Sequence, residues 1–198
     1  MATNSESRNT LMRLWLLLHR TADALARCED SVYGEYGLTT EQFAVLAAVK
    51  SSGGGPLRPV DLASIMDRGP NSMSMLVDRM VKAGLVRRTR DRKDRRAVKV
   101  SLTSKGEKAL EPATPAGWKL VKKILSPLSE KEKDALASLL ERVKCECLEY
   151  LDPEVDRAEI RRNSVTERPD LYEQLDKNIL ASGPKAKRRA VKRRKAMR

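Results

Sequence analysis

The chain has 198 residues, of which 40% are hydrophobic and 4% aromatic, and its formal net charge is +13. This length allows one or two modest cores, and the scarcity of aromatic side chains argues against a carbohydrate-binding or base-stacking surface. Nine of the basic residues lie in the stretch 185–198, which holds no acid, and residues 87–96 hold seven basic and two acidic residues. Such an excess of positive charge indicates a polyanionic partner.

The chain has three cysteines, Cys28, Cys145 and Cys147, and one histidine, His19. An odd cysteine count without a signal peptide fits reduced thiols, so we expect an intracellular protein. Cys145 and Cys147 are two apart on a helical pattern and face different directions, so we expect no metal site and no cofactor. The longest apolar cluster, residues 14–18, is far shorter than the roughly 20 residues that span a bilayer, so we expect no membrane association.

Two helices are predicted before residue 52. Between residues 11 and 26, apolar residues recur at intervals of three and four positions. This spacing predicts a helix with an apolar face wide enough to pack against two neighbouring elements. Thr39 and Gln42 form a capping box that begins the second helix. The Ser-Ser-Gly-Gly-Gly-Pro run at 51–56 ends that helix, and it lacks the Lys-Ser/Thr sequence of a nucleotide-binding loop.

A helix-turn-helix is predicted next. Apolar residues from 60 to 66 indicate a short helix, and Gly69-Pro70 separates it from another helix, in which proline suits the first position. One face of this second helix is apolar and the other is mainly polar. The apolar face holds Met73, Leu76, Val77 and Met80, and the other face holds Asn71, Ser74, Met75, Asp78 and Lys82.

A hairpin and two helices follow. Gly84 suits a helix end, and the alternation of Val98, Val100 and Leu102 predicts a strand that returns from an outward arm near residues 85–89. Residues 104–107 (Ser-Lys-Gly-Glu) have the form of a capping box for a helix that Pro112 and Pro115 should break or bend, with helix resuming by residue 118. Residues 129–132 cap the last strong helix; we expect two short helices in 152–180 and disorder in 182–198.

The helix that begins at Pro70 is the candidate reader of DNA, because the major groove, about 12 Å wide, admits one helix. Asparagine pairs with adenine, serine bonds a base or a phosphate, and methionine can touch a thymine methyl. The residues that project from its first turns are Asn71, Ser72, Ser74 and Met75. Capping and solvation of a surface helix is the alternative reading, and the basic hairpin beside the helix favours DNA.

The basic hairpin is the second candidate. Asp91 and Asp94 are spaced to orient arginine side chains, and an arginine at a hairpin tip can enter a narrow minor groove, where negative potential is focused. A solvated run of charge is the alternative.

Three stretches carry a specific pattern: residues 37–46 read GLTTEQFAVL, residues 76–88 read LVDRMVKAGLVRR, and residues 94–106 read DRRAVKVSLTSKG. Together they closely resemble the MarR family of bacterial winged helix-turn-helix regulators, over roughly residues 8–150. The resemblance implies a mostly α fold with a small antiparallel β wing, in which a winged helix-turn-helix lobe sits on a helical dimerisation domain. The chain departs from the family pattern at Pro112 and Pro115, where the family usually runs a long unbroken helix, and in its basic extension after Leu151.

The resemblance also implies a division of the chain. Residues 8–36 and 107–150 correspond to the dimerisation domain, and residues 37–106 to the winged helix-turn-helix domain. Residues 151–182 form a C-terminal extension, and residues 183–198 form a basic disordered tail.

The function implied is sequence-specific DNA binding by a homodimer on a palindromic operator, usually for repression, in the bacterial cytoplasm and at the nucleoid. Many members release DNA when an aromatic or lipophilic anion enters the cleft between dimer and DNA-binding lobes, so a small-molecule ligand is implied. By this resemblance Asp94 holds Arg96 in the minor groove, with Lys93 and Arg95 beside it. The full set expected to contact DNA is Asn71, Ser72, Ser74, Met75, Arg79, Lys93, Asp94, Arg95 and Arg96.

Three other readings are open to test. An architectural or RNA-associated protein would use the basic tail as a nonspecific grip on nucleic acid. An enzyme is not expected, because the chain has one histidine and lacks the Gly-x-Ser-x-Gly and His-Glu-x-x-His motifs. Some relatives sense oxidants through a cysteine on the first helix; Cys28 follows Arg27 near that helix's end, and we expect a buried or half-buried thiol there instead.

Overall fold

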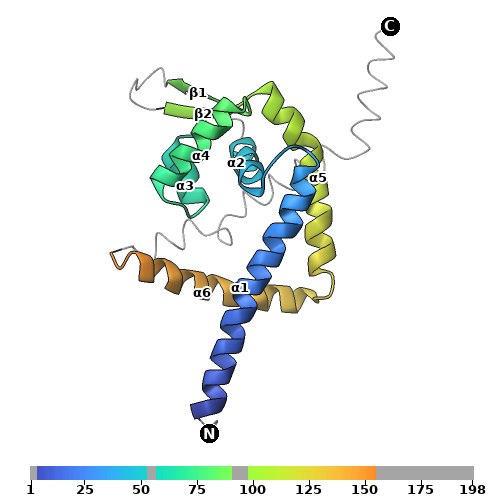
Figure 1. Cartoon of the computed structure of the whole chain (residues 1–198), viewed down its shortest axis with the longest axis vertical. Coiled ribbons are helices and arrows are strands. Elements are labelled where there is room, and N and C mark those ends of the chain that lie inside the picture. The colour runs from blue at the N-terminus through green and yellow to red at the C-terminus, as the bar shows by residue number, and fades with distance from the viewer. Residues whose placement is uncertain (1–3, 53–56, 91–97, 155–198) are drawn as a thin grey trace.

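The computed structural model describes residues 4–52, 57–90 and 98–154, which form six α-helices and one two-stranded antiparallel sheet (Figure 1). The mostly helical fold with a small sheet is therefore confirmed. The elements are α1 (Asn4–Gly34), α2 (Thr40–Ser51), α3 (Pro59–Ile65), α4 (Pro70–Lys82), β1 (Val86–Arg90), β2 (Val98–Leu102), α5 (Ser104–Leu125) and α6 (Glu130–Leu151).

The elements form a lobe and a frame of three long helices. The lobe consists of α2, α3, α4 and the β1–β2 hairpin, and α1 and α5 run side by side away from it (Figure 1). In the same view α6 crosses α1 below the lobe, and the N-terminal half of α1 extends beyond the crossing. The frame therefore carries the lobe at one end and leaves much of α1 and α6 uncovered.

The core of the lobe is shared by its helices and its hairpin. Apolar side chains from all of these elements are buried in one cluster. The removal of their apolar surface from water stabilises the folded lobe. The cluster includes Val45, Leu46, Val49, Leu62, Met73, Leu76, Val77, Met80, Leu85, Val86 and Val100. The apolar face predicted for α4 is confirmed, and the opposite face of α4 is thereby fixed toward solvent.

Tyr33 joins the lobe to the frame. Its ring stacks on Phe43 of α2, with centroids 4.0 Å apart and planes inclined by 12°. Gly117 of α5 lies against the same ring, since a Cβ at that position would be 2.5 Å from the Tyr33 hydroxyl. Burial, and then the nearby charge of Glu29, raises the pKa of Tyr33 to about 12. The end of α1, the start of α2 and the middle of α5 thus meet at one aromatic side chain.

The hairpin predicted from the period of two is confirmed. β1 and β2 pair antiparallel, with Arg88 opposite Val100, and Val100 is fully buried. Leu57 extends the sheet, because its N–H and C=O both bond the backbone of Val100, at 3.1 and 2.7 Å. The alternation of side chains puts residues of one parity in β1 over the core and those of the other parity toward solvent.

Helix starts were predicted well in two of three cases. The capping boxes of Thr39 with Gln42 and of Ser129 with Glu132 are both present. The expectation that Ser104 caps α5 is wrong: Thr103 is the N-cap residue, and its Oγ1 accepts from the N–H of Gly106. The hydroxyl of Thr103 also bonds the backbone carbonyls of Gly84 and Leu85, just before β1. These bonds fix Thr103 as the cap, one residue before the predicted Ser104.

The two prolines of α5 bend the helix without breaking it. Pro112 and Pro115 both lie inside one helix that runs from Ser104 to Leu125, so the expected interruption before Trp118 is absent. The axis of α5 changes direction between its first and second halves in Figure 1, as expected where proline removes backbone donors. Ala113, between the two prolines, and Gly117, two residues after Pro115, are buried, so packing against the lobe and α1 holds the distorted turns together.

The long first helix is exposed along most of its length. α1 begins well before and ends well after the predicted 11–26 segment, and Leu14, Trp15 and Leu18 on it are all exposed. His19 meets Trp15 edge to face, with ring centroids 4.8 Å apart. Cys28 is exposed too, so the expectation of a buried or half-buried thiol is wrong for the chain on its own. No neighbouring element of the described structure packs over that face of α1.

Candidate nucleic-acid interface

The turn between α3 and α4 determines where α4 begins. Asp67 closes α3 in the left-handed region, with φ of 47°, and the N–H of Arg68 donates to the carbonyl of Ala63 at 2.9 Å. Gly69 is the N-cap residue of α4, and Pro70 occupies the first turn, where its missing N–H has no cost. The turn predicted from Gly69-Pro70 is confirmed.

The first turns of α4 present a neutral face of small side chains. Asn71, Ser72 and Met75 are exposed, Met75 by 68%, whereas Ser74 is half-buried. Arg79 is exposed one turn further on. Three of the expected base-reading residues therefore share one accessible surface, and Ser74 lies at its edge, nearer the wing.

The N-terminus of α4 is also open to an anion. No side-chain hydrogen bond caps this helix in the described structure, because its N-cap residue is Gly69. The first amides of a helix point along a dipole whose positive end favours a phosphate oxygen. This arrangement can combine one backbone phosphate contact with base contacts from Asn71 and Ser72.

Arg88 of β1 reaches back from the wing to α4. Its guanidinium lies 2.5 Å from the carboxylate of Asp78, and it donates to the carbonyl of Ser74 at 3.4 Å. Arg88 stands opposite buried Val100, so it belongs to the core-facing parity of β1. The hairpin and α4 are therefore joined by a charged contact as well as by the shared core.

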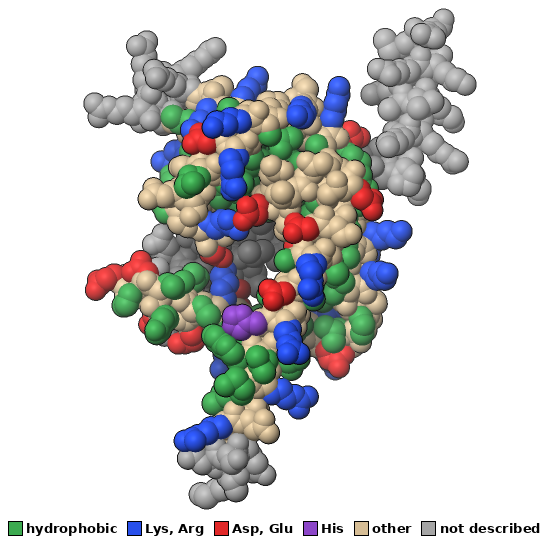
Figure 2. Space-filling view, in the orientation of Figure 1, with side chains coloured by type: hydrophobic (Ala, Val, Ile, Leu, Met, Phe, Trp, Pro, Cys, Tyr) green, Lys and Arg blue, Asp and Glu red, His purple; other side chains and the backbone are tan. Residues whose placement is uncertain are grey.

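The other parity of β1 faces solvent and carries positive charge. Arg87 is exposed, and its Nε donates to the hydroxyl of Ser101 across the hairpin at 3.1 Å. Figure 2 shows Lys and Arg side chains along the edge of the lobe where β1 and β2 lie. This basic edge adjoins the α4 face, which is the arrangement needed to hold phosphates beside a groove-reading helix.

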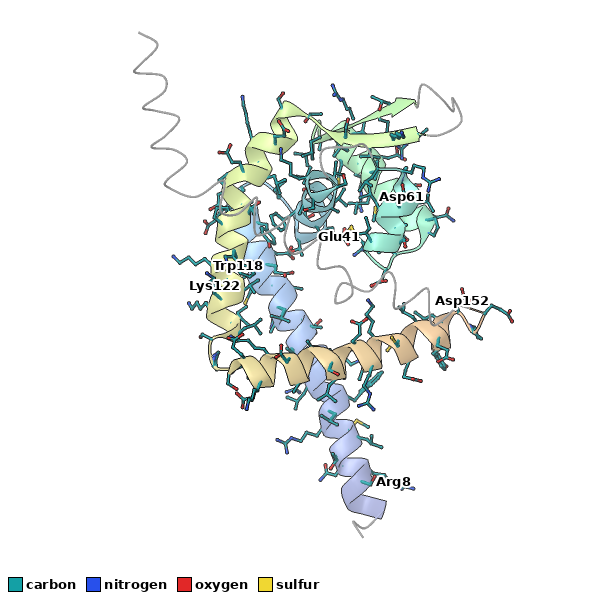
Figure 3. The ribbon with its side chains drawn as sticks, turned by 180° about the vertical axis from the view of Figure 1, so that it is seen from behind. Arg8, Glu41, Asp61, Trp118, Lys122 and Asp152 are labelled. Carbon is teal, nitrogen blue, oxygen red and sulfur yellow. The ribbon has the colours of Figure 1, made fainter. Side chains whose placement is uncertain are left out.

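Two acidic side chains of the lobe, Glu41 and Asp61 (labelled in Figure 3), form ion pairs with arginines around the helix-turn-helix. Glu41 of α2 pairs with Arg68 at 2.6 Å and lies 3.9 Å from Arg79. Asp61 accepts hydrogen bonds from the side chain of Arg58, which hold the pKa of the carboxyl below its usual value, although burial opposes this. Arg79, expected at DNA, therefore also faces an acid of its own lobe.

The base of the wing is fastened to α5 at Thr103 and Gly106. The Thr103 hydroxyl lies 2.6 Å from the carbonyl oxygen of Gly84 and 3.0 Å from that of Leu85. A side chain at Gly106 would overlap the Leu85 carbonyl oxygen, so only glycine fits this approach. The Leu-Thr-x-x-Gly pattern therefore has a steric reason.

The structure describes the positions of only part of the expected contact set. Lys93, Asp94, Arg95 and Arg96 lie outside the described residues, so their roles stay predictions. Asp78 and Arg88 were not singled out from the sequence as a pair. The signal was available, since Arg88 is in phase with Val86, Val98 and Val100 and must face the core side of the hairpin.

Other kinds of site find no support in the parts of the chain that the structure describes. Within residues 4–52, 57–90 and 98–154, no three His, Cys, Asp or Glu side chains gather as metal ligands would. None of the described helices combines the length and the apolar character needed to cross a bilayer. Cys145 is half-buried and Cys147 exposed, as expected for neighbours on different sides of α6.

A helix-turn-helix with an exposed second helix, followed by a basic two-stranded wing, defines a winged helix-turn-helix protein. Residues 36–97 match the family model described as MarR family. The chain is 30% identical over 136 residues to the HTH-type transcriptional regulator PecS of Dickeya dadantii, covering 68% of this chain and 78% of that protein. The chain therefore belongs to the MarR family of transcriptional regulators.

Solved structures agree with this assignment. A cysteine-to-serine variant of Escherichia coli MarR, complexed with operator DNA, is 26% identical with a TM-score of 0.61; the match covers 68% of this chain and 96% of that chain. The organohalide-sensing regulator RdhR in its 2,4-dichlorophenol-bound form has a TM-score of 0.66 at 24% identity, covering 76% and 88%, and so shows the same fold. These relatives are transcriptional regulators rather than enzymes.

Proposed function

We propose that this protein is a sequence-specific repressor that binds a palindromic operator as a homodimer. The observation that carries the proposal is the exposed, uncharged face of Asn71, Ser72 and Met75, which lies beside the basic edge of the wing on a lobe with one shared core. The E. coli MarR structure in complex with operator DNA supports this use of the same fold.

In the proposed complex α4 lies in the major groove. Asn71 pairs with an adenine, Ser72 bonds a base or a phosphate, and Met75 meets a thymine methyl. Ser74 contacts the groove edge and Arg79 a phosphate. At the wing tip Asp94 holds Arg96 for the minor groove, and Lys93 and Arg95 flank it on the backbone. This division separates base reading by the helix from grip by the wing.

The proposed dimer is formed by the helical frame. Residues 8–36 and 107–150 make up its dimerisation domain, and residues 37–106 make up the DNA-binding domain. The support is the set of large apolar side chains left exposed on α1 and α6, which include Leu11, Leu14, Trp15, Leu136, Leu139 and Val143. Figure 2 shows such side chains gathered around the N-terminal half of α1. A second copy would cover these side chains, and exposed apolar patches on a protein surface often mark interaction sites.

The proposed regulation is release of DNA by a small aromatic or lipophilic anion that binds between the frame and the lobe. The support is family membership, together with a relative of the same fold solved with 2,4-dichlorophenol. A thermal-shift screen with aromatic carboxylates tests this: a ligand must raise the melting temperature and weaken operator binding. If no compound in the screen both raises the melting temperature and weakens operator binding, the proposal is contradicted.

The main experiment is a gel shift with duplex DNA from upstream of the protein's own gene. The logarithm of the wild-type binding constant should fall linearly with the logarithm of the salt concentration, with a slope of about −0.9 for each phosphate that the protein neutralises. Arg96→Ala should weaken binding, and Asn71→Ala should cost about 1–3 kcal/mol at one base pair only. Lys131→Ala on α6 is the control, since it removes a positive charge away from the lobe. Unchanged affinity for Arg96→Ala would show that the wing assignment is wrong.

A second experiment separates this proposal from nonspecific binding through the basic tail. Deletion of residues 183–198 should weaken binding modestly and equally on all sequences. Loss of all binding would favour the architectural or RNA-associated alternative. A reporter driven by the same upstream DNA should rise when the gene is deleted if the protein is a repressor, and fall if it is an activator.

A further inference from the structure

An ion pair joins α6 to the helix-turn-helix. The Nζ of Lys144, on α6, lies 2.8 Å from the carboxylate of Asp67, in the turn between α3 and α4. α6 contributes no buried residue and packs extensively against none of the other described elements. Apolar packing therefore does little to fix the position of α6 relative to the lobe. A polar contact between α6 and the lobe accordingly contributes more to fixing that position.

Asp67 occupies a position that usually favours glycine. Its φ of 47° lies in the left-handed region, where asparagine and aspartate are tolerated better than other side chains. The backbone of this turn needs only a residue that accepts positive φ. Aspartate in place of glycine adds a carboxylate at the point where α3 ends and the chain turns into α4.

Lys144 is held firmly in its charged form. Its side chain is 28% exposed and that of Asp67 is 33% exposed. Burial lowers the pKa of Lys144, but the hydrogen bond and charge of Asp67, together with the charge of Glu141, more than offset this and raise it overall. Glu141 lies 3.9 Å from the same Nζ. A partly buried pair with a second acid nearby is screened less by salt than a fully exposed pair.

We propose that the Lys144–Asp67 pair is a tether that fixes the orientation of the helix-turn-helix on the dimer helices. Pro70, which begins α4, follows Asp67 by one short turn, so a rotation of the turn about α6 moves the recognition helix directly. In a dimer the tether then sets the separation of the two recognition helices, and with it the preferred half-site spacing of the operator. Lys144 and Asp67 are positioning residues that act without touching DNA; this inference rests on the proposed dimeric function.

The test compares Lys144→Met with Lys133→Met in the full chain. Both variants remove one charge from α6, but Lys133 pairs with Glu130 of its own helix, at 2.7 Å. The DNA probes are the footprinted upstream duplex and versions with the half-sites moved one base pair closer or further. Lys144→Met should lose about fivefold in affinity at the native spacing and discriminate less between spacings, and Lys144→Arg should restore both. Lys133→Met should match wild type.

A second measurement uses no DNA. Hydrogen–deuterium exchange of residues 64–72 in the free protein should be faster in Lys144→Met and in Asp67→Asn, with no further gain in the double variant, and unchanged in Lys133→Met. Equal exchange in Lys144→Met and wild type overturns the tether whatever DNA does. Faster exchange in Lys144→Met, combined with a wild type that binds none of the duplexes, overturns the proposed function and retains the tether.

Discussion

Arg88 of the wing and Asp78 of α4 form a close ion pair, with 2.5 Å between the guanidinium and the carboxylate. The arginine is thus engaged by its own lobe and does not simply add to a basic surface. It stands opposite buried Val100, on the core-facing parity of β1, and its guanidinium reaches α4. The wing and α4 should therefore move as one body.

This pair predicts a measurable coupling. Arg88→Met and Asp78→Asn should each lower the free energy of unfolding by about 0.2–1 kcal/mol, the range for solvent-exposed ion pairs. The double variant should lose less than the sum of the single losses, because each single change already removes the interaction. Urea unfolding of the four proteins checks this. Strict additivity would show that the contact contributes nothing in solution.

Gly106 should be irreplaceable at the start of α5. A methyl group there overlaps the Leu85 carbonyl oxygen, which is backbone and cannot swing away. Gly106→Ala should therefore cost about 3 kcal/mol of stability despite the better helix propensity of alanine. Gly34→Ala is the matched control, since its added Cβ meets nothing within 4 Å, and it should be neutral or slightly stabilising. Equal melting temperatures for the two variants would contradict the steric argument.

The apolar face of α1 should control association. Leu14 and Leu18 lie one turn apart, and both are exposed in the single chain. The double variant Leu14→Glu/Leu18→Glu should sediment as a monomer at concentrations where wild type sediments as a dimer. Arg8→Glu, on the same helix, should leave the dimer intact. If the double variant still sediments as a dimer, the dimer interface does not depend on this face of α1.

Stability at high pH should depend on Tyr33. Its pKa in the folded protein, about 12, exceeds the ordinary 10.0, so the folded state holds the phenol proton more tightly than the unfolded state. The resulting stability is present in full below about pH 10 and is lost as the pH rises toward 12. Over that interval wild type should lose up to about 3 kcal/mol more than Tyr33→Phe, measured by urea unfolding. Tyr150→Phe, at an exposed site, should keep the wild-type slope.

Local sequence patterns predicted those helices and strands whose conformation depends on residues close together in the sequence. The apolar period of α4, the alternation of β2, and the capping boxes at Thr39 and Ser129 all depend on residues within a few positions of one another. The candidate reading face of α4 followed from the same period. Family resemblance added the lobe and frame arrangement, which no single element encodes.

Contacts between distant segments were not predictable in this way. The bend of α5 at Pro112 and Pro115 is tolerated because buried Ala113 and Gly117 pack against other elements, and helix propensity contains no such information. Asp67 belongs to the lobe and Lys144 to α6 of the frame, and neither is part of a local sequence motif. The exposure of Cys28 follows from which elements cover α1, which its own apolar pattern does not reveal.

The exposed length of α1 bears on how the protein is made. α1 is synthesised before the lobe, yet α5, with which it runs side by side, is synthesised only after it. The lobe, whose contacts are mostly between neighbouring elements, can therefore fold while α1 still lacks a partner. Leu14, Trp15 and Leu18 stay in water throughout this interval and also after α5 has packed against α1. Translation rate and chaperone access should accordingly influence the yield of folded protein more through α1 than through the lobe.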